Sequence, residues 1–171
     1  MIKRVLDPCS IIRCQTWDSS VIAPVAVNEA LGVTWPQKTA TVVRGRVDIL
    51  CVGPTDWLVL VPDPDAIHWL HRLNELFQGS ALRATNVSQA LIRIEIDGPE
   101  VSDLLAKGCA LDLHPPLFPP GRAARTRFAG MPVIIRCTKA STFEIIVTQS
   151  YAEFLLSWLD DAELEFESLA S

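Results

Sequence analysis

An internal repeat limits the folds open to this chain of 171 residues more than any other feature of its sequence. When Val47 is aligned with Val133, the segment VDILCVGPTDWLVLVPDPDAIHWLHRL runs without a gap over VIIRCTKASTFEIIVTQSYAEFLLSWL. Apolar residues coincide along the alignment, and both segments read as strand, turn, strand and helix. The repeat therefore predicts an α+β fold with two similar lobes, each an antiparallel sheet with helices packed on one face. Cys51 and Cys137 align, which favours a role as small core residues.

Local patterns supply the remaining elements. We expect strands at 10–17, 46–52, 56–62, 82–87, 90–98, 125–130, 131–138 and 142–149. The strands at 82–87 and 90–98 are expected to pair, with Ile92, Ile94 and Ile96 on the buried face of the second one. Helices are expected at 24–32, 63–79, 99–108 and 150–166. The whole chain, 1–171, reads as a single domain with lobes at about 1–80 and 81–171.

Helix-end residues mark three of these helices. Asp63 or Asp65 is expected to cap the second helix, and Ser150, with Glu153 as its capping-box partner, the last one. In the third helix, Pro99 is expected at the first position. Gly108 is expected just past its end, in the left-handed conformation that costs glycine little.

The composition narrows the functional class. Apolar residues make up 49% of the chain, and the formal net charge is −5. Lys and Arg are scattered rather than gathered in a stripe, so a nucleic-acid partner is not expected. No apolar run is long enough to cross a bilayer, and no membrane association is expected. A high apolar content with moderate charge suits a chain whose surface is covered by partner proteins.

The five cysteines are odd in number and follow no framework spacing: Cys9, Cys14, Cys51, Cys109 and Cys137. The N-terminal segment lacks the long apolar core and cleavage site of a signal peptide. We therefore expect reduced thiols in a cytoplasmic protein.

The stretch LLAKGCALDLHPPLFPPGR, residues 104–122, raises the question of catalysis because Cys109 and His114 could act as nucleophile and base. Cys109 follows a helix C-terminus, where the partial negative charge disfavours a thiolate, although Lys107 could offset this in part. His114 precedes a proline, which favours an extended conformation. A proline-stiffened loop that presents a fixed surface is the favoured interpretation.

Other candidate sites are weaker. His68 and His71 are three residues apart on a helix and could share a metal, but no third ligand is evident. No dinucleotide, phosphate-loop, nucleophile-elbow or zinc-protease motif is present. The sequence therefore predicts no catalytic, cofactor-binding or metal-binding residue in this chain.

The loop also carries a family resemblance. A Gly-Pro helix start, a Lys-Gly-Cys helix end, a Leu-Asp-Leu step, a Phe-Pro-x-Gly turn and a Ser-Tyr-Ala helix entry resemble the gamma subunit of heterotetrameric sarcosine oxidase. The resemblance extends over about 47–159, with GPTDWL upstream and a weaker match before residue 46. We assign structural roles to the matching residues Trp57, Gly98, Pro99, Lys107, Gly108, Cys109, Asp112, Leu113, Pro119, Gly121 and Tyr151.

The resemblance implies a fold like the folate-binding part of aminomethyltransferases and a role without catalysis by this chain. The complex of that family demethylates sarcosine to glycine, with hydrogen peroxide and formaldehyde or methylene-tetrahydrofolate as products. Its alpha, beta and delta subunits hold FAD, FMN, NAD and zinc, and they handle tetrahydrofolate. The gamma chain is expected to support assembly and to shape internal cavities.

Two alternatives remain open. The chain could serve a related complex that oxidises other N-methylated amines or amino acids. It could also be a stand-alone folate-binding one-carbon-transfer protein, which would need a carboxylate in a cleft to hold the pterin ring. The available carboxylates are those of Asp97, Glu100, Asp103 and Asp112, which all lie at element ends where acidic residues are common.

Overall fold

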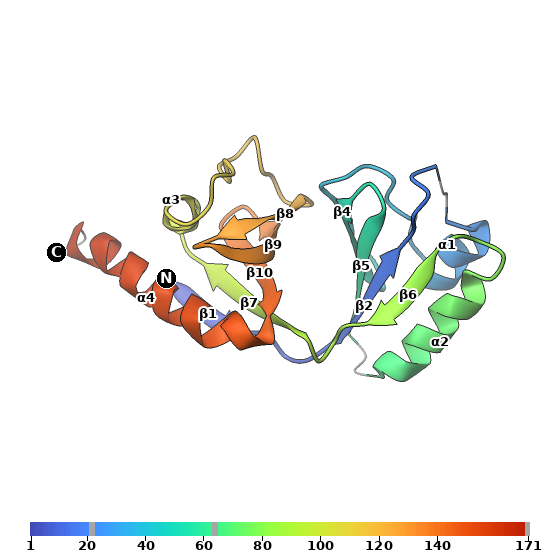
Figure 1. The fold of residues 1–171 in the computed structure, drawn as a ribbon. Helices are drawn as coiled ribbons and strands as arrows, with labels where there is room; N and C mark the ends of the chain where they lie inside the picture. The colour runs from blue at the N-terminus through green and yellow to red at the C-terminus, as the bar shows by residue number, and fades with distance from the viewer. Residues whose placement is uncertain (21–22, 63–64, 170–171) are drawn as a thin grey trace. The chain divides into compact units, whose positions relative to one another are not determined.

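The computed structural model describes residues 1–20, 23–62 and 65–169, and the chain divides into two compact units. The N-terminal unit is Asp7–Ala90, and the C-terminal unit is Leu91–Ser171 together with Met1–Leu6. The division thus falls ten residues later than the expected boundary near 80, and the first six residues belong to the second unit. Each unit is a five-stranded antiparallel sheet whose helices lie on one face (Figure 1).

The N-terminal unit has the strand order β3-β4-β5-β2-β6. Its strands are β2 (Ser10–Gln15), β3 (Thr41–Val43), β4 (Asp48–Gly53), β5 (Asp56–Val61) and β6 (Arg83–Asn86). Its helices are α1 (Val25–Leu31) and α2 (Ala66–Leu76). The core lies between this sheet and the helices and includes Trp35, Trp57 and Phe77.

The C-terminal unit has the matching order β1-β7-β10-β9-β8. Its strands are β1 (Ile2–Val5), β7 (Leu91–Asp97), β8 (Ala123–Phe128), β9 (Met131–Lys139) and β10 (Thr142–Thr148). Its helices are α3 (Val101–Ala106), the 3₁₀ turn η1 (Gln149–Tyr151) and α4 (Ala152–Leu169). The core again lies on the helix side, where Ile94 and Ile96 of β7 are fully buried, as the alternation predicted.

The strand register confirms the repeat. Cys51 lies opposite Trp57 across the β4–β5 pair, and Cys137 lies opposite Phe143 across the β9–β10 pair. The helices that follow begin at equivalent residues, α2 at Ala66 and α4 at Ala152. Both cysteines are buried, as expected for small core residues.

Three predictions about strand pairing and helix starts were wrong. The strands β6 and β7 do not pair, because β6 lies beside β2 in one sheet and β7 lies between β1 and β10 in the other. Pro99 precedes the helix instead of opening it, since α3 begins at Val101 after a turn in which the Val101 amide donates to the Gly98 carbonyl. Ser150 lies inside η1, so α4 continues from a 3₁₀ turn rather than from a serine cap.

The cap of α2 has the expected form. The Asp65 carboxylate accepts a hydrogen bond of 3.0 Å from the His68 amide. The other candidate cap, Asp63, lies outside the described residues. The start of α2, the helix of the first repeat copy, is therefore set by a side chain that the sequence identified.

A side chain of α2 protects the outer edge of β6. The Asn74 amide group accepts from the Ala84 amide at 3.1 Å and donates to the Ala84 carbonyl at 3.4 Å. It thereby satisfies backbone groups that a further strand would otherwise bind. Asn74→Ala should lower the free energy of unfolding by about 1–3 kcal/mol, because it leaves these partly buried groups without their partner.

Urea denaturation of both variants would check this, with Glu75→Ala as the matched control. Glu75 is exposed on the same helix, so its loss should change stability by no more than about 0.5 kcal/mol. Equal stability of the two variants would contradict a role for Asn74 at the sheet edge.

Candidate functional site

Most of the motif residues lie in the connection between α3 and β8, residues 107–122, which we call the α3–β8 loop. Two apolar side chains fix it to the core of the C-terminal unit: Leu113 is fully buried, and Phe118 is 4% exposed. The Phe118 ring stacks on Phe143 of β10, with 6.2 Å between the ring centres. The loop is therefore packed against the sheet.

A turn joins the end of this loop to the sheet. The Arg122 amide donates to the Pro119 carbonyl at 3.1 Å, and the Gly121 amide donates to the Cys137 carbonyl of β9, also at 3.1 Å. Gly121 has φ of +89°, a conformation that strains any residue with a Cβ atom. Pro119 and Gly121 thus set the direction in which the chain enters β8.

Gly108 contradicts the prediction of a left-handed helix end. It is absent from the residues with positive φ in the described chain, and its amide donates to the Leu105 carbonyl at 3.1 Å. A Cβ atom at this position would lie 2.9 Å from the ring of Phe128 and 2.9 Å from the ring of Trp158. Glycine is needed here because α3 ends tightly against β8 and α4.

Cys109 is buried in the core rather than exposed for reaction. Its Sγ atom lies 3.7 Å from the hydroxyl of Thr126 and accepts a hydrogen bond of 3.5 Å from the Leu111 amide. Lys107 does not support a thiolate, because its Nζ atom donates to the Ala162 carbonyl at 2.8 Å. The same ammonium pairs with Glu165 at 2.6 Å, so it joins the end of α3 to α4.

His114 binds two carboxylates. Its Nε2 atom lies 3.0 Å from Asp103 of α3, and its Nδ1 atom lies 3.1 Å from Asp112. The hydrogen bond with Asp103, followed by that with Asp112, raises the pKa of His114 above its ordinary value. Hydrogen bonds from the backbone and then the side chain of His114 lower the pKa of Asp112. With both ring nitrogens engaged, the imidazole is poorly suited to act as a general base.

These positions separate the two residues that the sequence suggested as a catalytic pair. The contacts of Cys109 lead into the core, whereas those of His114 lead to exposed carboxylates. The geometry favours the interpretation of the α3–β8 loop as a fixed structural segment.

The His114 contacts give a pH-dependent prediction. Because the folded state raises the pKa, the contribution of His114 to stability is fully present below its ordinary pKa of 6.5 and is lost as the pH rises through the folded value. An NMR titration of the imidazole should therefore give a midpoint above 6.5. Asp103→Asn should move the midpoint down, since it removes the largest cause of the shift. An unchanged midpoint in that variant would contradict the assigned contact.

A charged cluster that sequence reasoning missed lies on the face of the C-terminal sheet opposite the helices. Glu144 of β10 accepts from Arg93 of β7 at 2.7 and 3.1 Å and from Arg136 of β9 at 2.8 and 3.1 Å. Glu144 is 1% exposed and Arg136 is 5% exposed. Burial alone would raise the pKa of Glu144, but the bonds and charges of the two arginines outweigh it and lower the pKa.

The alignment of the two repeat copies contains a pattern from which this cluster could have been predicted. Its alignment sets Arg136 against Leu50 and Glu144 against Leu58, and each pair of residues lies cross-strand in its own sheet. An apolar cross-strand pair in the N-terminal unit is therefore a charged pair in the C-terminal unit. A simultaneous change at two aligned, adjacent positions indicates contact between them.

The remaining motif residues serve the fold. Trp57 is buried and donates from Nε1 to the Pro36 carbonyl at 2.8 Å. At Gly98 a Cβ atom would collide with the Met1 side chain. Tyr151 lies in η1 and is 42% exposed, so it contributes less packing than expected.

The described residues also show neither a membrane-spanning helix nor a group of metal ligands. None of the helices there is long and apolar enough to cross a membrane. Within the same residues, no group of three or more His, Cys, Asp or Glu side chains could hold a metal ion. His68 and His71, both on α2, are thus not joined by a third ligand among the residues described.

Solved structures define the class of protein. The chain aligns with heterotetrameric sarcosine oxidase from Corynebacterium sp. U-96, in complex with pyrrole 2-carboxylate, with a TM-score of 0.86 and 25% identity. The alignment covers 96% of this chain and 84% of that one. The glycine cleavage system aminomethyltransferase T from Bartonella henselae aligns with a TM-score of 0.60 and 12% identity, over 92% of this chain and 44% of that one. This second likeness shows a shared fold, which confirms the expected aminomethyltransferase-like architecture.

Sequence comparisons identify the family. The model of the sarcosine oxidase gamma subunit family matches residues 13–165. The sarcosine oxidase subunit gamma of Corynebacterium sp. (strain P-1) is 30% identical over 146 residues, which are 84% of this chain and 70% of that protein. The subunit gamma of an Arthrobacter species is 28% identical over 145 residues, with the same coverage. The chain therefore belongs to the sarcosine oxidase gamma subunit family.

Proposed function

We propose that this chain is a gamma subunit without catalytic residues of its own in a heterotetrameric complex that oxidatively demethylates sarcosine to glycine. The observation that carries the proposal is the alignment of 96% of the chain with a chain of heterotetrameric sarcosine oxidase. In this function the products would include hydrogen peroxide and either formaldehyde or methylene-tetrahydrofolate. The chain would act in assembly and in shaping the internal cavities of the complex.

The cofactors of this reaction would belong to the partner subunits. We assign FAD, FMN, NAD, zinc and tetrahydrofolate to the alpha, beta and delta chains, and a cytoplasmic location to the complex. The contacts of the α3–β8 loop support this division of labour. Cys109 is buried among core residues, and His114 is bound through both ring nitrogens, so neither presents a free reactive group.

The stand-alone folate-binding alternative has less support. The Asp97 carboxylate accepts from the Thr142 hydroxyl at 2.6 Å, and those of Asp103 and Asp112 bind His114. Three of the four candidate carboxylates are thus engaged in contacts within the C-terminal unit. The choice between sarcosine and another N-methylated substrate would be made by the larger subunits.

Native mass spectrometry of the tagged full-length chain, purified gently from its own host, tests the proposed function. We expect larger flavin-containing chains to copurify in a one-to-one ratio and the assembly to oxidise sarcosine. A monomer of 18.8 kDa that binds tetrahydrofolate alone would overturn the proposal. An assembly that oxidises only other N-methylated amines would overturn the substrate while retaining the subunit assignment.

A further inference from the structure

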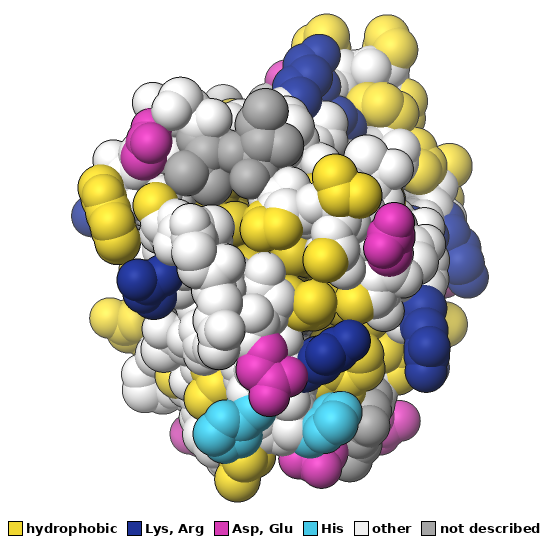
Figure 2. Space-filling model, turned by 90° about the vertical axis from the view of Figure 1, so that its right-hand side faces the viewer, with side chains coloured by type: hydrophobic (Ala, Val, Ile, Leu, Met, Phe, Trp, Pro, Cys, Tyr) yellow, Lys and Arg dark blue, Asp and Glu magenta, His cyan; other side chains and the backbone are white. Residues whose placement is uncertain are grey.

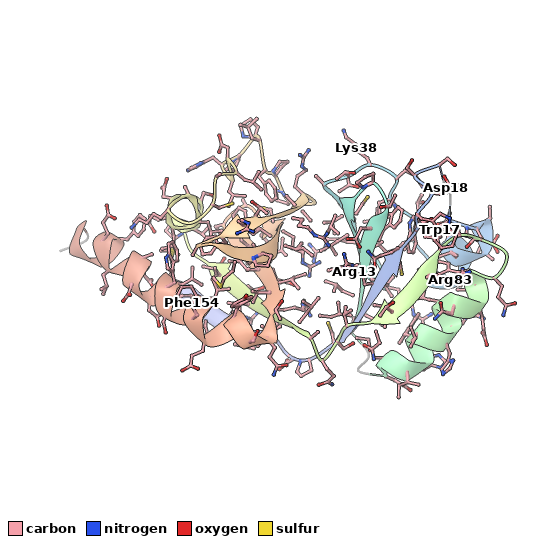
Figure 3. The ribbon with its side chains drawn as sticks, viewed as in Figure 1. Arg13, Trp17, Asp18, Lys38, Arg83 and Phe154 are labelled. Carbon is pink, nitrogen blue, oxygen red and sulfur yellow. The ribbon has the colours of Figure 1, made fainter. Side chains whose placement is uncertain are left out.

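Trp17 is the most exposed large hydrophobic side chain among the described residues, with 76% of its surface accessible. It lies just beyond the end of β2 in the N-terminal unit (Figure 3). Leaving an indole in water forgoes the free energy of burying one of the largest apolar side chains. An exposed tryptophan is thus a candidate for a contact made in an assembly.

The backbone around Trp17 is held in place by hydrogen bonds on both sides. The Thr16 amide donates to the Thr55 carbonyl at 3.1 Å, and the Asp18 amide donates to the Thr16 hydroxyl at 3.1 Å. Ser20 donates to the Asp18 carboxylate from its amide at 2.9 Å and from its hydroxyl at 2.6 Å. Because this backbone is already held in place, little backbone conformational entropy is lost when Trp17 binds a partner.

Arg83, the first residue of β6, stacks on the indole. The centre of its guanidinium lies 5.8 Å from the ring centre, and its Nη1 atom donates to the Ser80 and Leu82 carbonyls at 3.0 and 2.7 Å. Arg83 lies opposite Gln15, the last residue of β2, and Trp17 follows two residues later in the chain, which brings the guanidinium and the indole close together. In the described part of the chain, no carboxylate forms an ion pair with Arg83.

We propose that Trp17 and Arg83 together form an anchor through which this chain binds a larger subunit of its complex. The inference rests on the proposed function and adds the surface that makes the contact. The partner would present an apolar pocket for the indole and a carboxylate for the guanidinium. Tryptophan and arginine are the residue types that most often dominate the binding energy of protein interfaces, and charge complementarity calls for an acid opposite Arg83.

Other occupants fit the anchor less well. A polyanion such as nucleic acid would be repelled by a chain of net charge −5 that has no basic stripe. A twofold contact between two copies of the same patch would bring the two Arg83 cations together. A protein partner of complementary charge avoids both costs.

A second apolar surface does not indicate what kind of partner would bind it. Figure 2 shows hydrophobic side chains gathered on the side of the molecule that carries α1 and α2. Basic, acidic and histidine side chains surround them without a dominant charge. Ile67 of α2 lies in the same N-terminal unit as Trp17 and is 67% exposed. It therefore provides a matched control, an exposed apolar side chain outside the proposed anchor.

The test uses the tagged full-length chain in its own host, as wild type and as Trp17→Ala, Arg83→Glu and Ile67→Ala. We would measure the larger flavin-containing chains recovered per copy by native mass spectrometry and by flavin absorbance. Trp17→Ala and Arg83→Glu should each reduce recovery at least about tenfold, and Ile67→Ala should not. Melting temperatures of the Trp17→Ala and Ile67→Ala chains should match the wild type, since both side chains are exposed. Arg83→Glu also removes the hydrogen bonds to the Ser80 and Leu82 carbonyls, so it should melt only slightly earlier.

The outcomes separate this inference from the proposed function. If the wild type and both anchor variants recover the larger chains equally, the anchor is wrong and the subunit assignment stands. If the wild type recovers no such chain, the proposed function fails and the anchor fails with it. A wild-type homodimer that Trp17→Ala dissociates would overturn the larger subunit as the partner. A photocrosslinking residue at position 17 should label an acidic and apolar segment of a larger subunit, and exclusive labelling of a second copy would likewise overturn the proposal.

Discussion

Replacing Glu144 by Leu should lower the free energy of unfolding of the C-terminal unit by about 3–5 kcal/mol. The change removes the carboxylate that Arg93 and Arg136 share, and the two guanidinium groups lose the bonds that it accepts. Arg136 is almost fully buried, so water cannot replace the lost partner. Breaking a buried ion pair from one side carries a penalty of this size.

The N-terminal unit shows how the same positions can be filled without charge. The strand registers align Arg93 with Ile11, Arg136 with Leu50 and Glu144 with Leu58. The triple variant Arg93→Ile, Arg136→Leu, Glu144→Leu should therefore recover most of the stability lost by Glu144→Leu. Replacement of a whole buried ion cluster by packed apolar residues is often neutral or stabilising.

Urea denaturation of the three proteins would check this result. A triple variant as unstable as Glu144→Leu alone would show that the cluster cannot be replaced by the packing of the other unit. The pH dependence gives a second readout, because the folded state lowers the pKa of Glu144. Its contribution is present above the ordinary pKa of 4.5 and is lost as the pH falls through the folded value. The triple variant should lack this part of the acid sensitivity.

The repeat predicted more of the fold than any single motif did. Strand and helix periods identified β4, β5 and α2 and their counterparts β9, β10 and α4, because each element buries one face and its pattern is local. The pairing of β6 and β7 could not be obtained in this way. β6 pairs with β2, and β7 pairs with β10, and both partners lie far away in the sequence. The pattern within a strand does not show whether it pairs with a neighbouring strand or with a distant one.

The candidate site shows the same division between local and remote information. The sequence argued against catalysis by Cys109 from the partial negative charge at a helix end, and the burial of the side chain is a separate observation that the sequence did not predict. It did not reveal that His114 binds Asp103, because α3 and the loop approach each other only after folding. The Arg93–Glu144–Arg136 cluster was visible as a paired substitution in the repeat, but its burial was not.

The sequence correctly predicted that position 108 needs glycine, but the reason it gave was wrong. A glycine after a helix predicts a left-handed conformation, yet the tight contact with Phe128 and Trp158 requires it here. Gly108→Val should therefore destabilise the C-terminal unit by about 3 kcal/mol, at the upper end of the cost of overpacking a core. Gly108→Ala should cost less, about 1–2 kcal/mol, because it adds only the Cβ atom.

A double variant separates packing from backbone conformation as the cause. The Trp158 ring packs edge-on against Phe128 with 4.8 Å between the ring centres, so Trp158→Leu should open space beside position 108. Gly108→Ala should then cost less in the Trp158→Leu background than in the wild type, since the two residues are in contact. Gly53→Ala is the matched control, because its Cβ atom would meet Asp56 only at an ordinary 3.5 Å. An equal cost of Gly108→Ala in both backgrounds would mean that backbone conformation, not the close approach of α3 to α4, requires glycine at this position.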